Sequence, residues 1–379
     1  MLYHMPTEIA FGAGTIGELR RITTDRGAAS RPFLITDKGI GAAGIIPKVL
    51  AQISPVSVFD EVEPNPRDTT VDRGGGIARK IKPDLVIGLG GGSVLDAAKA
   101  VALLATNPGR IEDYEGRQRY KTAPLPVVAI PTTCGTGSEV TGVSVITHAE
   151  RRFKMSIKGM RMYPAVALVD PDLIQTLPAP LIASTGLDAL THAVEAFSVK
   201  PANFISDALA LEAIRLIFRF LPRAYQDIKG DREAREGQMK GSLLAGMAFG
   251  NSDVGAVHCL AESVGSLYDT PHGVANAIFL PPVMEFNLPA AREKYAVIAA
   301  AVGLEAADKD DAARALIQKI KDLSHSLSIP TFRELRIPEG DFGAIARKSF
   351  ENNSSSSNPR EASVGDYFQI LRQAHQTGA

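Results

Sequence analysis

The sequence predicts an α/β domain over residues 1–178 followed by an all-α domain over residues 179–379. Short β-branched runs alternate with helix-length segments in the first half, whereas long Ala-, Leu- and Ile-rich segments with helical periodicity make up the second. The length of 379 residues also fits about two domains at roughly 150 residues each. The Pro-punctuated stretch "QTLPAPL" at 175–181 marks the boundary between them.

Five short β-branched runs are the expected strands of the first half. Helix-length stretches separate them along the chain. Strands that alternate with helices in this way form βαβ units, in which helices cover both faces of a parallel sheet. The expected strands are residues 31–37, 57–62, 84–90, 124–131 and 166–171.

The second half predicts helices and no convincing strand. The segment "SDALALEAIRLIFRFLPRAYQDI" at 206–228 carries the apolar spacing of an amphipathic helix. The low-complexity stretch "ENNSSSSNPREAS" at 351–363 is expected to be a surface loop. A last helix is expected near residues 364–375.

Composition and charge exclude several classes of partner. Hydrophobic residues make up 45% and charged residues 22%, which is ordinary for a globular protein. The net charge of −1 and the lack of a basic run argue against nucleic acid and anionic membranes, and favour a small-molecule ligand. With no leader-like N-terminus, no membrane-length apolar run and two cysteines, Cys134 and Cys259, we expect a cytoplasmic homo-oligomer.

The stretch "DLVIGLGGGSVLDAAKAVALLA" at 84–105 orders a strand, a glycine-rich turn and a helix as a phosphate site requires. Gly90, Gly91 and Gly92 let backbone N–H groups approach a pyrophosphate at the positive end of the helix dipole. Ser93 fits either a helix cap or a phosphate contact. Because the third glycine of the dinucleotide fingerprint is missing, a tight turn without a ligand is the alternative. A second triplet, Gly74 to Gly76, has no strand before it and is expected to be structural.

A second loop, "IPTTCGTGSEVT" at 130–141, also follows an expected strand. Its hydroxyl side chains can donate to ribose or phosphate, and such loops at the carboxyl ends of neighbouring strands are where open α/β sheets bind ligands. Asp37, at the end of the first expected strand, fits a ribose contact that favours NAD over NADP, or a plain helix N-cap. The hydroxyl residues concerned are Thr132, Thr133, Thr136 and Ser138.

Two pairs of polar residues in the helical half suggest a metal site. Asp188 and His192 stand four apart in a helical stretch, so both point from one face. One acid-to-His pair at this spacing is about what random placement gives, roughly 0.8, so the spacing alone decides nothing. His258 and His272 follow, fourteen residues apart, and three imidazoles with one carboxylate suit Fe(II), Zn or another divalent ion. The alternative is a set of satisfied core histidines.

Four motifs together resemble the iron-containing (group III) alcohol dehydrogenases. They are "GGGSVLDAAK", "PTTCGTGSEVT", "GLDALTHAVEA" and "HCLAESVGSLYDTPHGVANA", and the similarity runs over essentially the whole chain. The resemblance implies an architecture like that of dehydroquinate synthase, with a dinucleotide-binding α/β domain, a helical metal-binding domain and an active site in the cleft between them.

The resemblance also implies roles for individual residues. By motif position, the metal ligands are Asp188, His192, His258 and His272. Val143 and Phe249 fall where the family shapes its substrate pocket. The cofactor-binding positions are Gly90, Gly91, Gly92, Ser93, Asp96, Thr132, Thr133 and Thr136, joined by Asp37, Val145 and Lys154.

Two positions depart from the family pattern. Cys134 stands where alanine is common, a small-for-small change expected to be silent. Glu262 stands four residues after His258, where many relatives carry a further histidine assigned to substrate contact or proton transfer. Glu262 is therefore expected either to replace that histidine as a proton relay or to recognise a polar substrate group.

The implied reaction is metal-dependent hydride transfer between NAD(H) and a small alcohol or carbonyl compound, with Fe(II) as the expected metal. One alternative keeps the same residues, as a hydroxyacid-oxoacid transhydrogenase with tightly held nicotinamide or a maleylacetate reductase. Another is a dehydroquinate-synthase-like lyase, which is disfavoured because no Lys/Arg cluster lies beside the His motifs. A non-catalytic nucleotide-binding protein would not need the three histidines and the aspartate.

Overall fold

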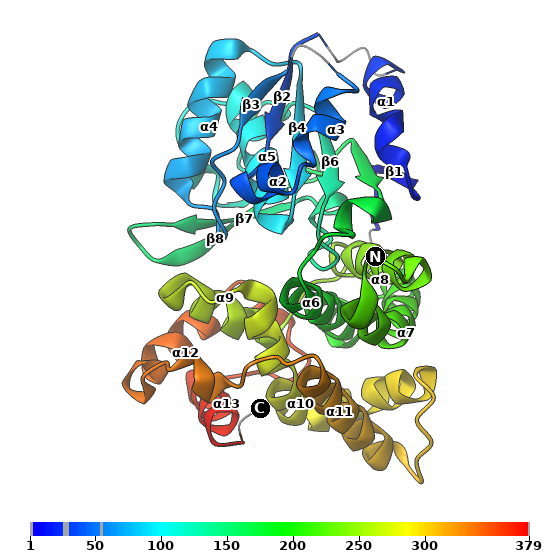
Figure 1. The fold of residues 1–379 in the computed structure, drawn as a ribbon. Helices are drawn as coiled ribbons and strands as arrows, with labels where there is room; N and C mark the ends of the chain where they lie inside the picture. Colours follow the sequence, from blue (N-terminus) through cyan, green and yellow to red (C-terminus); the bar gives the residue numbers. More distant parts are fainter. Residues whose placement is uncertain (1–2, 26–29, 54–55, 378–379) are drawn as a thin grey trace. The chain divides into compact units, whose positions relative to one another are not determined.

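The computed structural model describes residues 3–25, 30–53 and 56–377, which form two compact units. One unit is His4–Leu177 and the other contains the residues from Pro178 on (Figure 1). Residues 1–2, 26–29, 54–55 and 378–379 belong to the ranges expected for the two domains but lie outside the described residues. Among the described residues, no helix combines the length and the apolar character that a membrane crossing needs.

A six-stranded sheet in the order β1-β9-β6-β4-β2-β3 forms the centre of the His4–Leu177 unit (Figure 1). All of its strand pairs are parallel, which confirms the α/β prediction. The five expected strands are present, while the edge strand β1 was not expected, because its sequence "EIAF" is short and only partly buried. The strands are β1 Glu8–Phe11, β2 Pro32–Ile35, β3 Ser57–Phe59, β4 Leu85–Gly90, β6 Val127–Pro131 and β9 Val166–Val169.

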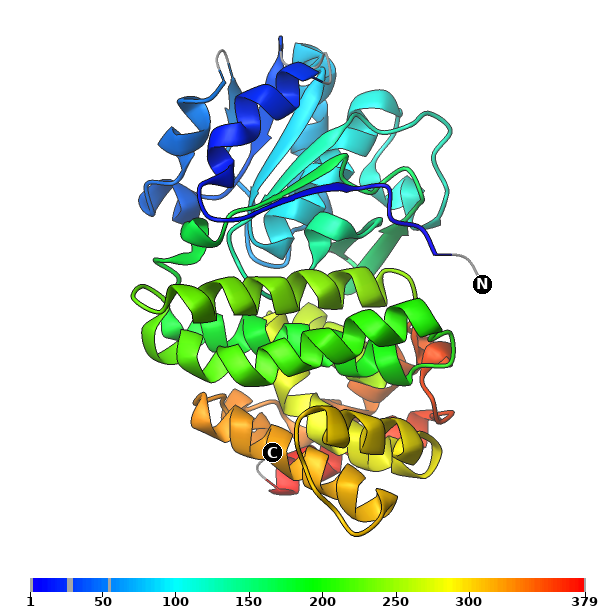
Figure 2. The ribbon, with the colours of Figure 1, turned by 90° about the vertical axis from the view of Figure 1, so that its right-hand side faces the viewer.

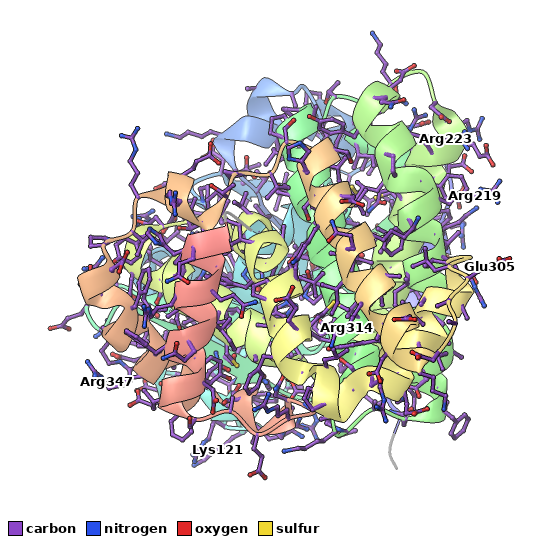
Figure 3. All side chains as sticks on the ribbon, turned by 90° about the horizontal axis from the view of Figure 1, so that it is seen from below. Lys121, Arg219, Arg223, Glu305, Arg314 and Arg347 are labelled. Atoms are coloured by element: carbon purple, nitrogen blue, oxygen red, sulfur yellow. The ribbon has the colours of Figure 1, made fainter. Side chains whose placement is uncertain are left out.

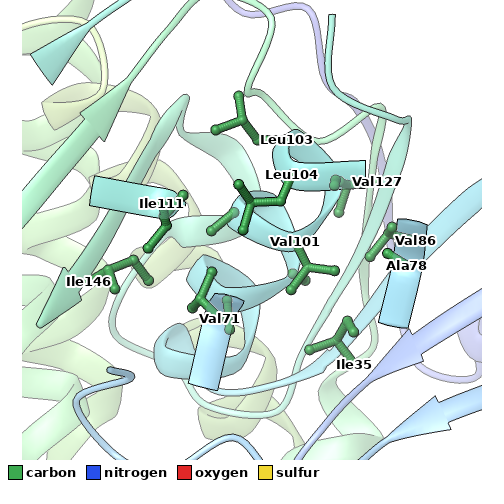
Figure 4. Close-up of a cluster of buried hydrophobic side chains, with 14 of the residues drawn as sticks. Ile35, Val71, Ala78, Val86, Val101, Leu103, Leu104, Ile111, Val127 and Ile146 are labelled. Atoms are coloured by element: carbon green, nitrogen blue, oxygen red, sulfur yellow. The ribbon is translucent and has the colours of Figure 1, made fainter. Parts of the chain in front are cut away.

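Helices cover both faces of this sheet, because alternate strand residues point to opposite sides. Val86 packs with α4 and α5 (Figure 4). Phe33 belongs to the same cluster, whereas Leu34 and Ile87 pack with α1 and α3 on the other side. The central strands are buried on both faces, as expected for parallel strands between helices. The helices are α1 Leu19–Asp25, α2 Lys38–Ala42, α3 Ile46–Leu50, α4 Asp68–Ile81 and α5 Gly92–Thr106, with 3-10 turns η1 Thr15–Glu18, η2 Ile111–Tyr114, η3 Ser138–Val140 and η4 Pro171–Ile174.

The second glycine triplet is structural, as expected. Gly74 and Gly75 lie inside α4, where it packs against α5. A Cβ atom at Gly75 would lie 2.7 Å from the Cβ of Leu104, and one at Gly74 would lie 2.8 Å from a methyl group of Val101. Glycine at these positions therefore permits the close contact between the two helices.

A second, three-stranded sheet in the same unit was not expected from the sequence. It has the order β5-β8-β7 and consists of β5 Gly116–Arg117, β7 Val143–His148 and β8 Phe153–Lys158. β7 and β8 form an antiparallel hairpin that brings Val145 opposite Ser156 and Thr147 opposite Lys154. The charged run "HAERRFK" at 148–154 interrupts the apolar pattern, so neither strand is recognisable from the sequence.

The residues from Pro178 on form the helical unit, and no strand occurs among those the structure describes there, as predicted. The long helices α6, α7 and α8 pack side by side (Figure 2). Arg219 and Arg223 of α7 lie on the outside (Figure 3) and form ion pairs with Asp231 and Glu233 near the start of α8. The helices are α6 Ala179–Ser198, α7 Phe204–Asp227, α8 Arg232–Phe249, α9 Ala256–Tyr268, α10 His272–Ala301, α11 Lys309–Ser326, α12 Phe342–Glu351 and α13 Val364–Thr377, with 3-10 turns η5 Phe332–Leu335, η6 Glu339–Asp341 and η7 Ser355–Ser357.

The serine-rich segment 351–363 is not the simple surface loop that its composition suggested. Ser354 and Asn358 are buried. Asn358 accepts a hydrogen bond from the backbone N–H of Ala256 and exchanges two side-chain hydrogen bonds with Asn287. Ser354 and Ser357 donate to the carboxylate of Asp253. The small polar residues thus support the loop before α9, because they can satisfy buried backbone and carboxylate groups.

Candidate active site

Helix α6 presents three acidic or imidazole side chains on one face. Asp188, His192 and Glu195 follow one another at spacings of four and three residues, which places them along one stripe of the helix. All three are buried, at 2%, 4% and 4% exposure, in a helix whose other residues are mostly apolar. Polar groups buried in this way need hydrogen-bond or ionic partners.

Two further helices bring histidines to this stripe. His258 is the third residue of α9, and His272 is the first residue of α10, directly after Pro271. The start of α10 approaches α6 closely, since a Cβ atom at Gly273 would lie 2.3 Å from the carbonyl oxygen of Ser184. The glycine of the "PHG" turn therefore allows His272 to lie beside Asp188, with 3.7 Å between Nε2 and Oδ1.

The four residues expected as metal ligands lie together. Asp188, His192, His258 and His272 each offer one ligand atom, and these four atoms all lie within 4.8 Å of one another. The rings of His192 and His258 are 4.5 Å apart between centroids, and those of His258 and His272 are 5.3 Å apart. The side chain of His272 is 32% exposed, so the site is accessible at this ligand.

Asn276, one turn after His272 on α10, shows how the ligand atoms converge. Its Nδ2 donates to Asp188 Oδ1 at 2.6 Å and lies 3.1 Å from Nε2 of both His258 and His272. One carboxylate oxygen and two imidazole nitrogens, each able to act as an acceptor, therefore lie around one small region. Asn276 is fully buried, and its Oδ1 has no hydrogen-bond partner among the described residues. Converging acceptors of carboxylate and imidazole type fit a divalent cation.

The charges of the site are strongly affected by burial. Burial raises the pKa of Asp188 to about 6, and the nearby His258 and the hydrogen bond from Asn276 oppose that rise. Burial also acts to lower the pKa of His258, but the Glu195 carboxylate, together with those of Asp188 and Glu262, outweighs this effect, so the pKa is raised. A bound dication would favour the charged carboxylate and the neutral imidazole that metal ligation requires.

The sequence pattern predicted no role for Glu195, although this residue lies within the motif "GLDALTHAVEA". Its Oε2 lies 2.5 Å from Nδ1 of His258, and its Oε1 accepts from the backbone N–H of Val257 at 2.9 Å. The available signal was its position three residues after His192, on the same helix face as Asp188. A sequence alone does not show that this face meets the start of α9.

Phe249 and Glu262 lie next to the ligand cluster. The Phe249 ring stacks on His192 with 4.2 Å between centroids and 14° between planes. Glu262 is one helical turn after His258 and only partly buried, and its Oε2 accepts from Asn352 Nδ2 at 2.6 Å. The serine-rich segment 351–363, which contains Asn352, therefore also positions Glu262.

The glycine and threonine loops pack against each other in the His4–Leu177 unit. The backbone N–H of Thr132 donates to the carbonyl oxygen of Gly90 at 3.0 Å. A Cβ atom at Gly91 would lie 3.1 Å from Thr133 Cγ2, and one at Gly92 would lie 2.5 Å from Thr136 Cγ2. Ser93 is the second residue of α5, and Gly91 occupies the N-cap position, so Ser93 is not the cap. The partly exposed N-terminus of α5 remains suited to a phosphate group.

Asp96, on α5, connects this helix to the threonine loop and to β7. Its carboxylate accepts from Ser138 Oγ at 2.6 Å and from the backbone N–H of Val145 at 2.9 Å, and it forms an ion pair with Lys99 at 3.1 Å. Lys99 is 1% exposed and donates to the backbone carbonyls of Ser138 and Val143. Lys99 also has no role assigned from the sequence, yet it holds the threonine loop to α5.

The other residues named from the sequence lie at separate places in the two units. Asp37 is the N-cap of α2, where its Oδ1 accepts from the backbone N–H of Ile40 at 2.9 Å, so the capping role is present. Lys154 on β8 donates to Asn65 Oδ1 at 2.5 Å. Val143 starts β7 and is partly exposed, whereas Phe249 belongs to the helical unit. Cys134 is fully buried.

The matches with known proteins extend over most of the chain. Residues 6–171 match the family model of iron-containing alcohol dehydrogenase, and residues 182–375 match the model of the Fe-containing alcohol dehydrogenase family, C-terminal. The 1,3-propanediol dehydrogenase of Citrobacter freundii is 42% identical over 353 residues, and the match covers 91% of each chain. The NAD-dependent methanol dehydrogenase of Bacillus methanolicus is 36% identical over 379 residues, covering 98% of this chain and 99% of the relative.

Solved structures give the same result. A crystal structure of 1,3-propanediol oxidoreductase superimposes with a TM-score of 0.94 at 40% identity, covering 98% of this chain and 99% of that chain.

Proposed function

Because the chain belongs to the iron-containing alcohol dehydrogenase family and is thus a metal-dependent, NAD-linked oxidoreductase of alcohols and aldehydes, we propose how its residues perform this reaction. Asp188, His192, His258 and His272 bind one divalent ion, Fe(II), in the helical unit. The glycine and threonine loops of the other unit bind NAD. The substrate is a small alcohol or aldehyde that carries a second polar group.

One observation supports this proposal above the others: four buried or half-buried donors from three helices have ligand atoms within 4.8 Å of one another. A bound divalent ion supplies Lewis-acid polarisation of the substrate C–O group, and the nicotinamide supplies or accepts the hydride. The protein's own contribution is positioning. Its buried helix faces hold the donors, and Phe249, stacked on His192, is proposed to form a wall of the substrate pocket.

The donor set itself accepts both Fe(II) and Zn. It contains no thiolate, and affinity alone favours Zn over Fe(II). We propose Fe(II) on the basis of the matched family models. Protein freed of metal and reloaded with Fe(II) should reduce small aldehydes faster than Zn-loaded protein, at equal metal content per chain.

The function is tested by oxidation of 1,3-propanediol and reduction of short aldehydes, with NAD(H) and NADP(H) compared in parallel. Activity should require added free cofactor and should vanish when a chelator removes the metal. Turnover between a hydroxyacid and an oxoacid without added free NAD would instead identify a transhydrogenase. Full NADH-dependent aldehyde reduction by metal-free protein would contradict the proposal.

Asp37 is proposed to select NAD. A carboxylate at the end of β2 repels a 2′-phosphate, and one charge pair about 4 Å apart is worth about 4 kcal/mol near a protein surface. Asp37→Ser removes the charge while keeping an N-cap acceptor for α2. The ratio of kcat/KM for NADP to that for NAD should rise at least about tenfold, which is about 1.4 kcal/mol.

A matched control for this variant is Asp308→Ser. Asp308 is the N-cap of α11 in the other unit and accepts from the backbone N–H of Asp311. This change should leave the cofactor ratio as it is. An unchanged ratio in Asp37→Ser would show that Asp37 is only a helix cap.

Glu262 is proposed to recognise a second hydroxyl group of the substrate. Asn352 holds one carboxylate oxygen, while Glu262 is partly exposed one turn after His258. A hydrogen bond to a charged group is worth about 1.5–3 kcal/mol, or roughly 10- to 100-fold. Glu262→Gln should lower kcat/KM for 1,3-propanediol at least about tenfold more than for 1-propanol, with no loss of bound metal.

The control for Glu262 is Glu351→Gln, an exposed position at the end of α12. It should affect neither substrate. An equal loss for the diol and the simple alcohol would assign Glu262 to proton transfer instead of recognition.

A further inference from the structure

We propose that Glu195 is a positioning residue that joins the ligands of α6 and α9 into one metal site. This inference rests on the proposed metal-binding function of Asp188, His192, His258 and His272. Asp188, His192 and Glu195 share one face of α6, whereas His258 comes from the first turn of α9. Glu195 connects the two helices, because its carboxylate binds Val257 and the proposed ligand His258 at the start of α9.

Both carboxylate oxygens of Glu195 are occupied by groups of α9. Oε2 accepts from His258 Nδ1 at 2.5 Å, and Oε1 accepts from the backbone N–H of Val257 at 2.9 Å. The side chains of Glu195 and His258 are only 6% and 4% exposed, so water does not compete for these bonds. A bidentate attachment to one backbone group and one ring fixes the position and the orientation of the imidazole.

The hydrogen bond to Glu195 also selects the tautomer of His258. A carboxylate only accepts, so Nδ1 must carry a proton, and in the neutral ring Nε2 then has a free lone pair. Asn276 Nδ2, a donor, lies 3.1 Å from Nε2 and agrees with this assignment. Glu195 therefore directs the lone pair of Nε2 toward Asp188 and His272, where the ligand atoms converge.

The start of α9 is shaped to admit this carboxylate. Its N-cap is Gly255, which has no side chain to bind the first free N–H groups. Asn358 and Glu195 bind those of Ala256 and Val257 instead. A Cβ atom at residue 255 would lie 2.9 Å from Asn358 Oδ1 and 3.0 Å from Glu195 Oε1, so glycine leaves room for both side chains.

The charges also match a divalent ion. Asp188 and Glu195 are both buried and supply two negative charges, and the three histidines are neutral when they bind metal. A dication with these two carboxylates makes a neutral buried group, which avoids the large penalty for an uncompensated buried charge. Removing the charge of Glu195 should therefore weaken the binding of a dication even where the four ligands remain.

The test compares Zn²⁺ affinity, measured by competition with a chromogenic chelator in the absence of substrate, for wild type, Glu195→Gln, Glu195→Asp and Glu212→Gln. In Glu195→Gln, the amide nitrogen must face either Val257 N–H or His258 Nδ1–H, so one of the two bonds is lost. Its affinity should fall about 10- to 100-fold, the range typical for outer partners of metal ligands. Glu195→Asp keeps the charge but is one methylene shorter, and should lie between Glu195→Gln and wild type.

The control Glu212→Gln changes an exposed glutamate of α7 and should bind Zn²⁺ as wild type does. Melting temperatures measured with and without Zn²⁺ separate positioning from general stability. In Glu195→Gln, the increase in melting temperature on adding Zn²⁺ should fall by more than the melting temperature of the metal-free protein does. Wild-type Zn²⁺ affinity in folded Glu195→Gln would overturn the proposal.

A second measurement needs no variant. Selective ¹⁵N labelling of the seven histidines should show His258 in Zn²⁺-loaded wild type as the tautomer protonated on Nδ1, and protonation on Nε2 would overturn the proposal. These readouts involve no substrate. A protein whose Zn²⁺ affinity depends on Glu195 but which oxidises no alcohol would disprove the proposed reaction and leave this inference standing.

Discussion

His272→Ala should lose bound metal and alcohol oxidation together. His272 is the first residue of α10 and the most accessible of the four proposed ligands, and its Nε2 lies 3.7 Å from Asp188 Oδ1. Removing one of four ligands leaves three donors from two helices. A metal supplies several kcal/mol of charge stabilisation in reactions of this kind, and about 4 kcal/mol corresponds to ~10³ in rate. We therefore expect kcat/KM to fall by about 10³-fold or more, measured together with the metal content per chain.

His325→Ala is the matched control for this prediction. His325 is an exposed histidine near the end of α11, in the same unit. Its removal should leave metal content and kcat/KM at wild-type values. If His272→Ala lost metal but kept its activity, the metal would be structural, and the proposed chemistry would be wrong.

The proposed metal ligands are the part of the candidate site for which the sequence offered the clearest signal. Asp188 and His192 show a helical spacing, and the two later histidines stand in quoted motifs, so family resemblance could assign all four. The structure brings these four together. Their assignment as ligands still rests on the experiment above.

The supporting residues could not be found in the same way. Glu195 and Asn276 act across helix interfaces, on His258 of α9 and on Asp188 of α6. Such contacts depend on which helix faces meet, and periodicity shows only that a face exists. The same limit explains the segment 351–363, whose composition is typical of a loop although Asn358 is fully buried against α9 and α10.

The strands were predicted correctly where the apolar pattern of the sequence is strong. The central strands β4 and β6 are fully buried apolar runs and were located within a few residues. β7 and β8 have partly exposed faces and a charged turn, so their pattern resembles that of a loop. Their pairing depends on each other and on Asp96, which binds the N–H of Val145.

Lys99→Met should strongly destabilise the His4–Leu177 unit. Lys99 is buried and makes an ion pair with Asp96, and its ammonium donates to three backbone carbonyls, those of Ser138, Thr141 and Val143. Methionine keeps most of the aliphatic part of the side chain but removes the donor to these carbonyls and the positive charge beside Asp96, which retains its hydrogen bonds from Ser138 and Val145. Breaking a buried pair by removing one partner typically costs about 3–5 kcal/mol. The exposed control Lys80→Met on α4 should change the free energy of unfolding by no more than about 0.5 kcal/mol.

The loss should also grow with pH, because a second carboxylate lies near Lys99. Burial raises the pKa of Glu139 to about 7, and Lys99 opposes that rise. A carboxyl group whose pKa is raised on folding contributes stability at low pH that is lost as the pH rises through its folded value. Without Lys99, the Glu139 carboxylate is uncompensated at pH 8 but is neutralised by a proton at pH 6. Urea unfolding should therefore show a larger deficit for Lys99→Met at pH 8 than at pH 6, whereas an equal deficit at both values would mean that Lys99 acts through Asp96 and the carbonyls alone.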